Sequence, residues 1–210
     1  MIYKIGSKGP EVKQIQKALN IEADGIFGQM TEQAVKDFQE ANGLDIDGIV
    51  GPHTWAILFN DDLMLDKSRR KIRQIILHCS ATIEGKDYTV EQIRQWHLKR
   101  GFNDIGYHYV IYRDGTIHNG RHVDQSGAHT LAHNHDSIGI CYIGGLDANS
   151  KPKDTRTDKQ KESMYKLIDK LLKLYNLTIN DVYGHYQFQN KACPCFKIET
   201  FRKEFNEYLS

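Results

Sequence analysis

Three side chains of this sequence have the chemistry of metal ligands. His78 ends the apolar run Ile75–Leu77, and His185 and Cys193 follow far downstream. Two imidazoles and one thiolate are the usual protein share of a catalytic zinc site, which keeps its fourth position for water. Lys191 stands two residues before the cysteine, where a cation can neutralise an oxyanion during hydrolysis. The pattern favours a hydrolytic zinc centre over a structural one, in which a neighbouring lysine has no use.

The composition of the 210-residue chain is that of an ordinary globular protein, with 40% hydrophobic and 26% charged residues. Its net charge of +1 gives no strong field for nucleic acid or an anionic membrane, so we expect neither partner, and we expect a monomer. Four cysteines are too few for a dense disulfide framework. No apolar stretch reaches membrane-spanning length, and the N-terminus lacks the apolar core of a signal peptide. We therefore expect cytoplasmic synthesis and release by another factor.

Residues 1–60 contain an internal repeat. The segments Asp24–Gly28 and Asp47–Gly51 lie 23 residues apart, and a threonine follows each of them three residues later. Each copy is typical of a glycine turn that leads into a helix. Short amphipathic stripes, such as Val12, Ile15 and Leu19, accompany the turns. We expect a three-helix domain over residues 1–60, with its two turns related by approximate twofold symmetry.

The next segment, residues 61–70, is charged and predicts a linker, and the run Arg69–Lys71 is expected to be its solvated end. Residues 71–210 then alternate between strand and helix patterns. Strands are predicted at 73–79, 107–112, 138–143 and 182–184, with a hairpin turn at 113–116. Helices are predicted after capping boxes at Thr89 and Thr157, and a last helix over 199–208. This alternation predicts an α/β domain in which helices flank a mixed central sheet.

Six short blocks within residues 71–210 stand in a characteristic order: Leu77–Thr82, Gly106–Tyr109, Arg113–Gly115, His133–Asn134, Ser137–Ile140 and Lys191–Pro194. In this order they resemble the phage-type zinc amidases, which are N-acetylmuramoyl-L-alanine amidases related to the animal peptidoglycan recognition proteins. The resemblance runs from about Arg73 to the C-terminus. Residues 1–60 are similar to the small peptidoglycan-binding domain of many cell-wall hydrolases. Six blocks in order are far more specific than any single motif.

The resemblance implies roles for the matching residues. The family's zinc ligands fall on His78, His185 and Cys193, and its two catalytic helpers fall on Tyr107 and Lys191. One Zn²⁺ per chain would activate water and polarise the lactyl carbonyl of N-acetylmuramic acid. Tyr107 would orient the water and Lys191 would stabilise the oxyanion, until the amide breaks and frees the amine of L-alanine. The implied substrate is bacterial peptidoglycan.

The resemblance gives three further candidates for substrate binding: His129 and Asn134, whose matching segment lines the family's peptide groove, and Thr82 at the end of the first block. His129 and Asn134 can equally well be structural. Some family members carry a glutamate where this chain has Cys141, so the resemblance leaves a carboxylate base in doubt and gives more weight to Tyr107.

Taken one at a time, His78, His185 and Cys193 are more simply a structural histidine pair and a buried thiol, and only the ordered blocks favour metal binding. Most of the ten histidines are not expected to be ligands. His108 alternates with Tyr107 along a strand and is expected to be buried and hydrogen-bonded on the opposite face. The remaining expectations are packing for His97 and surface positions in turns for His118, His122 and His135.

Two functions of different class fit these observations. The first is a cell-wall hydrolase of endolysin type, with a binding domain that precedes a zinc amidase. The second is a non-catalytic peptidoglycan-binding receptor, because such relatives keep the groove and lose zinc ligands. The presence of all three ligand residues favours the enzyme. Regulation through a protein partner such as a polymerase is a third possibility, and no residue supports it.

Overall fold

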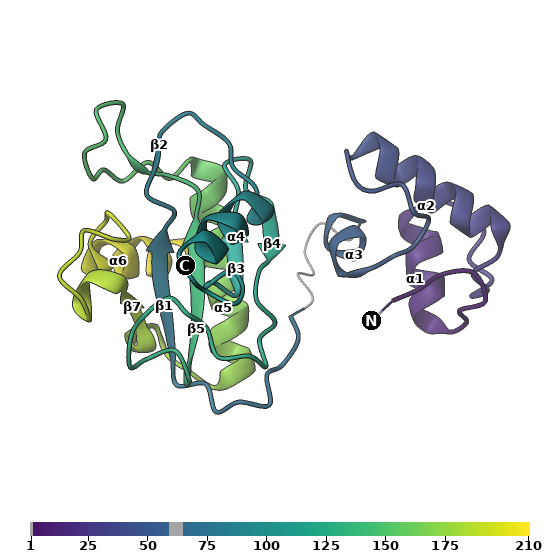
Figure 1. Cartoon of the computed structure of the whole chain (residues 1–210). Helices are drawn as coiled ribbons and strands as arrows, with labels where there is room; N and C mark the ends of the chain where they lie inside the picture. Colours follow the sequence, from purple (N-terminus) through teal and green to yellow (C-terminus); the bar gives the residue numbers. More distant parts are fainter. Residues whose placement is uncertain (1, 59–64) are drawn as a thin grey trace. The chain divides into compact units, whose positions relative to one another are not determined.

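The computed structural model describes residues 2–58 and 65–210, which form two compact units, Met1–Leu65 and Asp66–Ser210 (Figure 1). Residues 61–64 of the predicted linker lie outside the described residues, and Asp66–Arg70 belong to the second unit. No helix in the described ranges is long and apolar enough to cross a membrane.

The first unit contains three helices, α1 (Pro10–Ala18), α2 (Gln29–Ala41) and α3 (Pro52–Leu58). Each of the first two helices buries one apolar stripe, because its hydrophobic residues recur at helical spacing. The buried core consists of Val12, Ile15, Phe27, Val35, Val50 and Trp55. The expected helical character of this region is confirmed.

The repeat in the first unit contains two equivalent hydrogen-bond networks, each centred on a buried glutamine. The buried Gln16 amide nitrogen donates to Asp24 Oδ1 (2.7 Å), the Ile26 carbonyl (3.0 Å) and Thr31 Oγ1 (3.1 Å). Gln39 makes the equivalent three contacts with Asp47, Ile49 and Thr54 at 2.7, 3.0 and 3.1 Å. In each network the glutamine Oε1 accepts the N–H of a glycine with positive φ, Gly25 or Gly48. The turns are therefore alike because one buried amide satisfies each of them.

The second unit is built on a five-stranded sheet with the order β4-β3-β5-β1-β7. The strands are β1 (Gln74–Cys79), β3 (Tyr109–Ile111), β4 (Ile117–Asn119), β5 (Ser137–Tyr142) and β7 (Val182–Gly184). Only β4 runs antiparallel, as the hairpin partner of β3. A second, two-stranded sheet pairs β2 (Thr82–Ile83) with β6 (Gly145–Leu146). The mixed sheet expected from the alternating pattern is confirmed.

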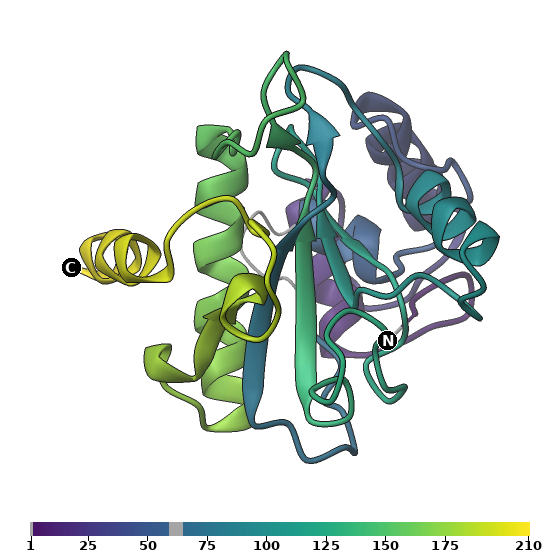
Figure 2. The ribbon, with the colours of Figure 1, turned by 60° about the vertical axis from the view of Figure 1, so that its left-hand side comes forward.

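Three helices and two short 3₁₀ turns complete the second unit: α4 (Val90–Lys99), α5 (Asp158–Tyr175), α6 (Ile198–Leu209), η1 (Ile179–Asp181) and η2 (His185–Gln187). Figure 2 shows α4 (teal) and α5 (green) on opposite faces of the sheet. Both predicted capping boxes are present, since Thr89 and Thr157 accept the N–H of Gln92 and Gln160. On the α4 face, Val90 and Ile93 pack with Val110 of β3, among other residues.

Three expectations for this unit are wrong. β3 is shorter than the predicted strand 107–112. The carbonyls of Tyr107 and His108 accept the N–H groups of Arg121 and Gly120, but these donors lie beyond the end of β4, outside the regular ladder of β3 with β4. His118 lies in β4 and stacks on Tyr112 at 3.7 Å between ring centroids, so it is not in a turn.

The third error concerns Arg70, which is not a solvated linker residue. Its guanidinium donates to four backbone carbonyls at 2.7–3.2 Å, those of Val123, Asn134, His135 and Ser137. Its neighbour Arg69 does remain exposed, at 90% of its side-chain surface. Arg70 thus ties the start of this unit to the loop that precedes β5, a role that its sequence neighbourhood does not reveal.

Candidate metal centre

The ends of two parallel strands bring His78 and His185 together. β1 and β7 are hydrogen-bonded neighbours with Leu77 opposite Gly184, so the next residues along the two strands, His78 and His185, emerge at the same edge of the sheet. Side chains at the carboxyl ends of parallel strands are the usual place for an α/β site. His78 also pairs with Cys141 of β5, which sets it on the α4 face of the sheet.

Cys193 reaches the same edge from the loop between η2 and α6. The Tyr186 N–H donates to the Cys193 carbonyl at 2.8 Å, and the Tyr142 hydroxyl donates to the Pro194 carbonyl at 2.9 Å. The Cys193 sulfur itself accepts the N–H of Cys79 at 3.3 Å. These three contacts fix the loop against β1 and β5, so the thiol position does not depend on the loop alone.

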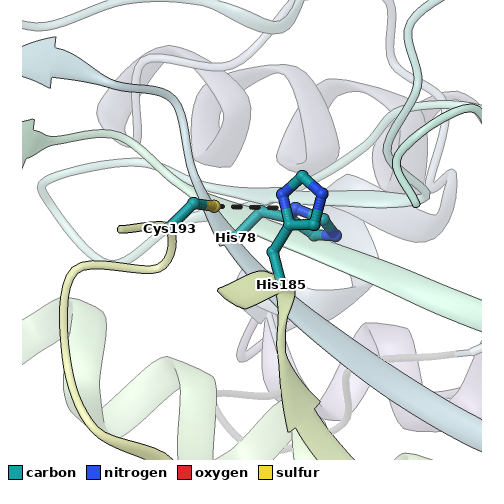
Figure 3. Close-up of side chains that lie close together, drawn as sticks. All are labelled: His78, His185 and Cys193. Carbon is teal, nitrogen blue, oxygen red and sulfur yellow. Dashed lines mark hydrogen bonds between the residues drawn. The ribbon is translucent and has the colours of Figure 1, made fainter. Parts of the chain in front are cut away.

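The donor atoms of His78, His185 and Cys193 lie within 4.8 Å of one another. The His78 and His185 rings are 4.6 Å apart between centroids, and the Cys193 sulfur lies 3.7 Å from His78 Nδ1. Figure 3 shows the three side chains converging from separate segments. Imidazole nitrogen and thiolate sulfur at this separation can share one tetrahedral ion, and both histidines are buried.

The second nitrogen of each histidine is occupied by a hydrogen-bond partner. His78 Nε2 lies 3.1 Å from His129 Nδ1, and His185 Nε2 lies 2.8 Å from Gln189 Oε1. Since both Nε2 atoms are engaged, each imidazole has Nδ1 left as the candidate ligand atom. Such outer partners fix the tautomer and orientation of metal-binding histidines. Sequence reasoning missed Gln189, although its spacing of four residues from His185 was visible.

Electrostatics keep the histidines neutral. Burial lowers the pKa of His78 well below its usual value, and the neighbouring His129, His185 and Lys191 lower it further. Burial also lowers the pKa of His185, and the Lys191 ammonium acts in the same direction. A neutral imidazole is the form that ligates a metal, so both rings have their lone pairs available near neutral pH.

Two other thiols near the cluster are less suited to metal binding. The Cys79 and Cys195 sulfurs lie 3.5 Å apart. The hydrogen bond with Cys193 and burial raise the pKa of Cys79 to about 12, and the hydrogen bond with Cys79 raises the pKa of Cys195. Both groups are therefore protonated at neutral pH, whereas a metal binds the thiolate.

Of the two predicted catalytic helpers, Tyr107 lies beside His78, and Lys191 is close enough for its charge to act on both histidines of the cluster. The Tyr107 ring is 5.1 Å from the His78 ring between centroids, and burial raises the pKa of its phenol well above 10. Tyr107 is therefore a neutral hydroxyl that can donate or accept a hydrogen bond. Lys191 is exposed and borders a cavity of about 310 Å³, which Tyr186, Cys195 and Lys197 also line. Its charge acts on both histidines and can act on a bound substrate.

The three predicted substrate-binding residues are engaged in internal contacts. His129 is buried against His78. Asn134 Oδ1 accepts the N–H groups of His129 and Thr130, each at 2.8 Å. Thr82 is buried in β2, and its hydroxyl bonds to that of Ser80 at 2.8 Å. Their contact with substrate stays a prediction, and the contacts present here are structural.

Two family models match the chain. Residues 68–196 match the family described as N-acetylmuramoyl-L-alanine amidase, and residues 8–58 match a peptidoglycan binding domain. The amidase match includes His78, Tyr107, His185, Lys191 and Cys193.

Relatives of known sequence and structure agree with these matches. The endolysin of Klebsiella phage KP32 is 38% identical over 131 residues, which are 62% of this chain and 85% of that protein. A peptidoglycan-recognition protein of Drosophila melanogaster is 31% identical over 129 residues, 59% of this chain and 68% of that one. The solved structure of the amidase LysC from Clostridium intestinale aligns with a TM-score of 0.56 at 29% identity, over 65% of this chain and 87% of that one.

Proposed function

This chain belongs to the N-acetylmuramoyl-L-alanine amidase family and hydrolyses peptidoglycan as an amidase, and from that premise we propose that it depends on one zinc ion held by His78, His185 and Cys193. The bond cleaved joins the lactyl carbonyl of N-acetylmuramic acid to the amine of L-alanine. The observation that carries the proposal is the convergence of two neutral imidazoles and one thiol within 4.8 Å.

The donor set fits zinc in number and in chemical type. Three protein donors leave one position open, as catalytic zinc sites do, and the set contains no hard carboxylate of the kind that calcium or magnesium prefers. A zinc ion bound there would supply a Lewis acid and a water of lowered pKa. The Cys193 thiolate donates charge, so such an ion is a weaker acid than one held by three imidazoles, and the protein has to supply further stabilisation.

Tyr107 and Lys191 are the groups that we expect to supply it. Because Tyr107 stays a phenol, it orients the attacking water through a hydrogen bond and does not act as a phenolate base. Lys191 is exposed, and its charge acts on both His78 and His185, so we expect its ammonium to attract the carbonyl oxygen as negative charge develops. Cys141 occupies the position where some relatives carry a glutamate, and its buried thiol lies 3.6 Å from the Tyr142 carbonyl. A carboxylate base is therefore not available at this position.

The first unit is proposed to bind the cell wall and so to hold the amidase on its substrate. Its match to a peptidoglycan binding domain supports this role. A weak binding module tethered to an enzyme raises the enzyme's local concentration on an insoluble polymer without any contact to the reacting bond. The phage endolysin relatives support a role in lysis, in which the protein acts on the wall after its release from the cytoplasm.

A non-catalytic peptidoglycan receptor is the alternative function, and the relationship to the peptidoglycan-recognition protein of Drosophila melanogaster gives it a basis. The complete donor set argues for the enzyme.

Mass spectrometry of a peptidoglycan digest, with and without a chelator, tests the proposal. The expected products are stem peptides with a free amine on L-alanine, absent after chelation and restored by zinc. New reducing sugars would identify a glycosidase, cleavage inside the peptide would identify an endopeptidase, and no product would favour the receptor.

A further inference from the structure

His129 has a position that substrate binding does not explain. The residue is 7% exposed, and its ring faces Nε2 of His78, whereas Cys193 faces Nδ1 of His78. Two glycines leave the space that the ring occupies: a Cβ atom at Gly139 would come within 2.5 Å of the His129 ring, and one at Gly127 within 2.4 Å. The fold therefore reserves this space for an imidazole that faces a predicted zinc ligand.

The contacts of Ser137 determine which nitrogen of His129 carries the proton. The Ser137 hydroxyl donates to the His133 carbonyl at 2.6 Å, so its proton is already used. His129 Nε2 lies 3.3 Å from the same oxygen, which can only accept from it. His129 thus carries its proton on Nε2, and its Nδ1 is an acceptor, which Thr130 Oγ1 also approaches at 3.2 Å.

The tautomer of His129 determines that of His78. His129 Nδ1 lies 3.1 Å from His78 Nε2, and since the former accepts, the latter is the donor. A neutral imidazole has one proton, so with the proton on Nε2 the lone pair of His78 is on Nδ1. Nδ1 is the atom 3.7 Å from the Cys193 sulfur, toward the centre of the cluster.

We propose that His129 is a positioning residue, which fixes the tautomer and orientation of His78 so that its Nδ1 lone pair faces the metal, and that Ser137 fixes His129 in turn. The proposal rests on the zinc site proposed above. Asn134 supports the arrangement, because its Oδ1 accepts the backbone N–H groups of both His129 and Thr130 and so holds the segment that carries the ring. A neutral histidine takes the place of the carboxylate or carbonyl that usually accepts this hydrogen bond.

Two variants of His129 separate positioning from substrate contact. His129→Leu removes the acceptor and keeps much of the volume, whereas His129→Asn offers its Oδ1 close to the original Nδ1 position. We expect His129→Leu to weaken zinc affinity by about 10- to 100-fold and His129→Asn to restore most of it. The exposed His135, with 72% of its side-chain surface accessible, provides the matched control His135→Leu, which should bind zinc as the wild type does.

Ser137→Ala gives a second measurement if His129→Leu does not fold, because it leaves the histidine in place and removes the acceptor of its Nε2 proton, together with the hydroxyl that donates to the His133 carbonyl. It should weaken zinc binding by a few-fold. In the wild-type protein, long-range ¹H–¹⁵N NMR should show His78 protonated on Nε2 and His129 protonated on Nε2. A proton on His129 Nδ1 would overturn the proposal.

The deciding experiment is competition for zinc against a chromophoric chelator at pH 7, on the full chain and each variant, together with KM and kcat. Positioning predicts weaker zinc binding in His129→Leu with little change of KM in the zinc-saturated enzyme. Unchanged zinc affinity with a raised KM would make His129 a groove residue and refute the proposal. If the wild type itself binds no zinc, the zinc proposal fails instead, so the two failures are distinguishable.

Discussion

Replacing Lys191 with methionine should slow the reaction without removing the metal. The proposed role of its ammonium is to stabilise the developing oxyanion, and among the described residues no contact joins this ammonium to the three proposed ligands. Removing one oxyanion donor from a buried site costs about 100- to 1,000-fold in kcat. Lys191 is exposed at the edge of its cavity, where water screens its charge, so the lower limit applies. We expect a loss of about 100-fold, which corresponds to about 2.7 kcal/mol of activation free energy.

Zinc binding should respond in the opposite direction. The Lys191 charge lowers the pKa of both His78 and His185, and a cation that disfavours a proton on these rings also disfavours a metal ion. Lys191→Met should therefore hold zinc at least as tightly as the wild type. This expectation separates a catalytic lysine from a structural one.

The assay is the rate of amine release from a soluble glycan–peptide fragment at saturating substrate, with zinc content measured on the same samples. Lys197→Met is the matched control, because Lys197 lines the same cavity and its ammonium lies over the Tyr186 ring at 5.3 Å. Its kcat should stay near that of the wild type. A Lys191→Met variant that keeps wild-type kcat, or that loses zinc together with activity, would rule out this role for Lys191.

Three further predictions concern the ligand thiol, the first unit and pH. Cys193→Ser should lose both zinc and turnover, whereas Cys195→Ser should keep both; equal effects of the two in metal analysis would contradict the assignment. Gln39→Ala should destabilise the first unit by about 2–4 kcal/mol, because it leaves the buried N–H of Gly48 and the carbonyl of Ile49 without their partner. Calorimetry of the full chain measures this change, and an unchanged transition temperature would disprove the role of the Gln39 network. Burial lowers the pKa of His97 and of His108 to about 4, below the ordinary value of about 6.5. The unfolded chain therefore takes up protons between pH 6.5 and 4 that the folded chain does not. The stabilisation that the two neutral rings provide should be fully present above pH 6.5 and fall toward pH 4, and the free energy of unfolding in urea should drop by on the order of 1–2 kcal/mol per imidazole at pH 5. A free energy of unfolding that does not change with pH would show that the rings are accessible to protons.

The sequence was sufficient for the features that depend on local pattern. The α/β alternation, the two capping boxes and the hairpin turn all follow from neighbouring residues, and the structure contains them. The candidate ligands His78, His185 and Cys193 were identified by ordered blocks, and the chain folds so that they meet. Strand ends explain this outcome, because parallel pairing of β1 and β7 needs only the right register to place both histidines at one edge.

Contacts between distant segments could not be predicted in the same way. Arg70 lies in a basic run, and nothing near it indicates four carbonyl partners that come from residues 123–137. Gln16 and Gln39 keep the 23-residue spacing of the repeat, yet a glutamine on a helix has no intrinsic preference for burial. His129 matched a groove segment, and only the orientation of its ring reveals that it faces His78.

X-ray absorption at the zinc edge of the zinc-loaded full chain is the most direct test of the central claim. We expect one zinc per chain, with two nitrogen neighbours at roughly 2.0–2.1 Å, one sulfur at roughly 2.3 Å and one further light atom from solvent. Cys193→Ser should bind little zinc, and any zinc that it holds at high loading should have no sulfur neighbour. A wild-type spectrum without sulfur, or a sulfur signal that survives in Cys193→Ser, would contradict it.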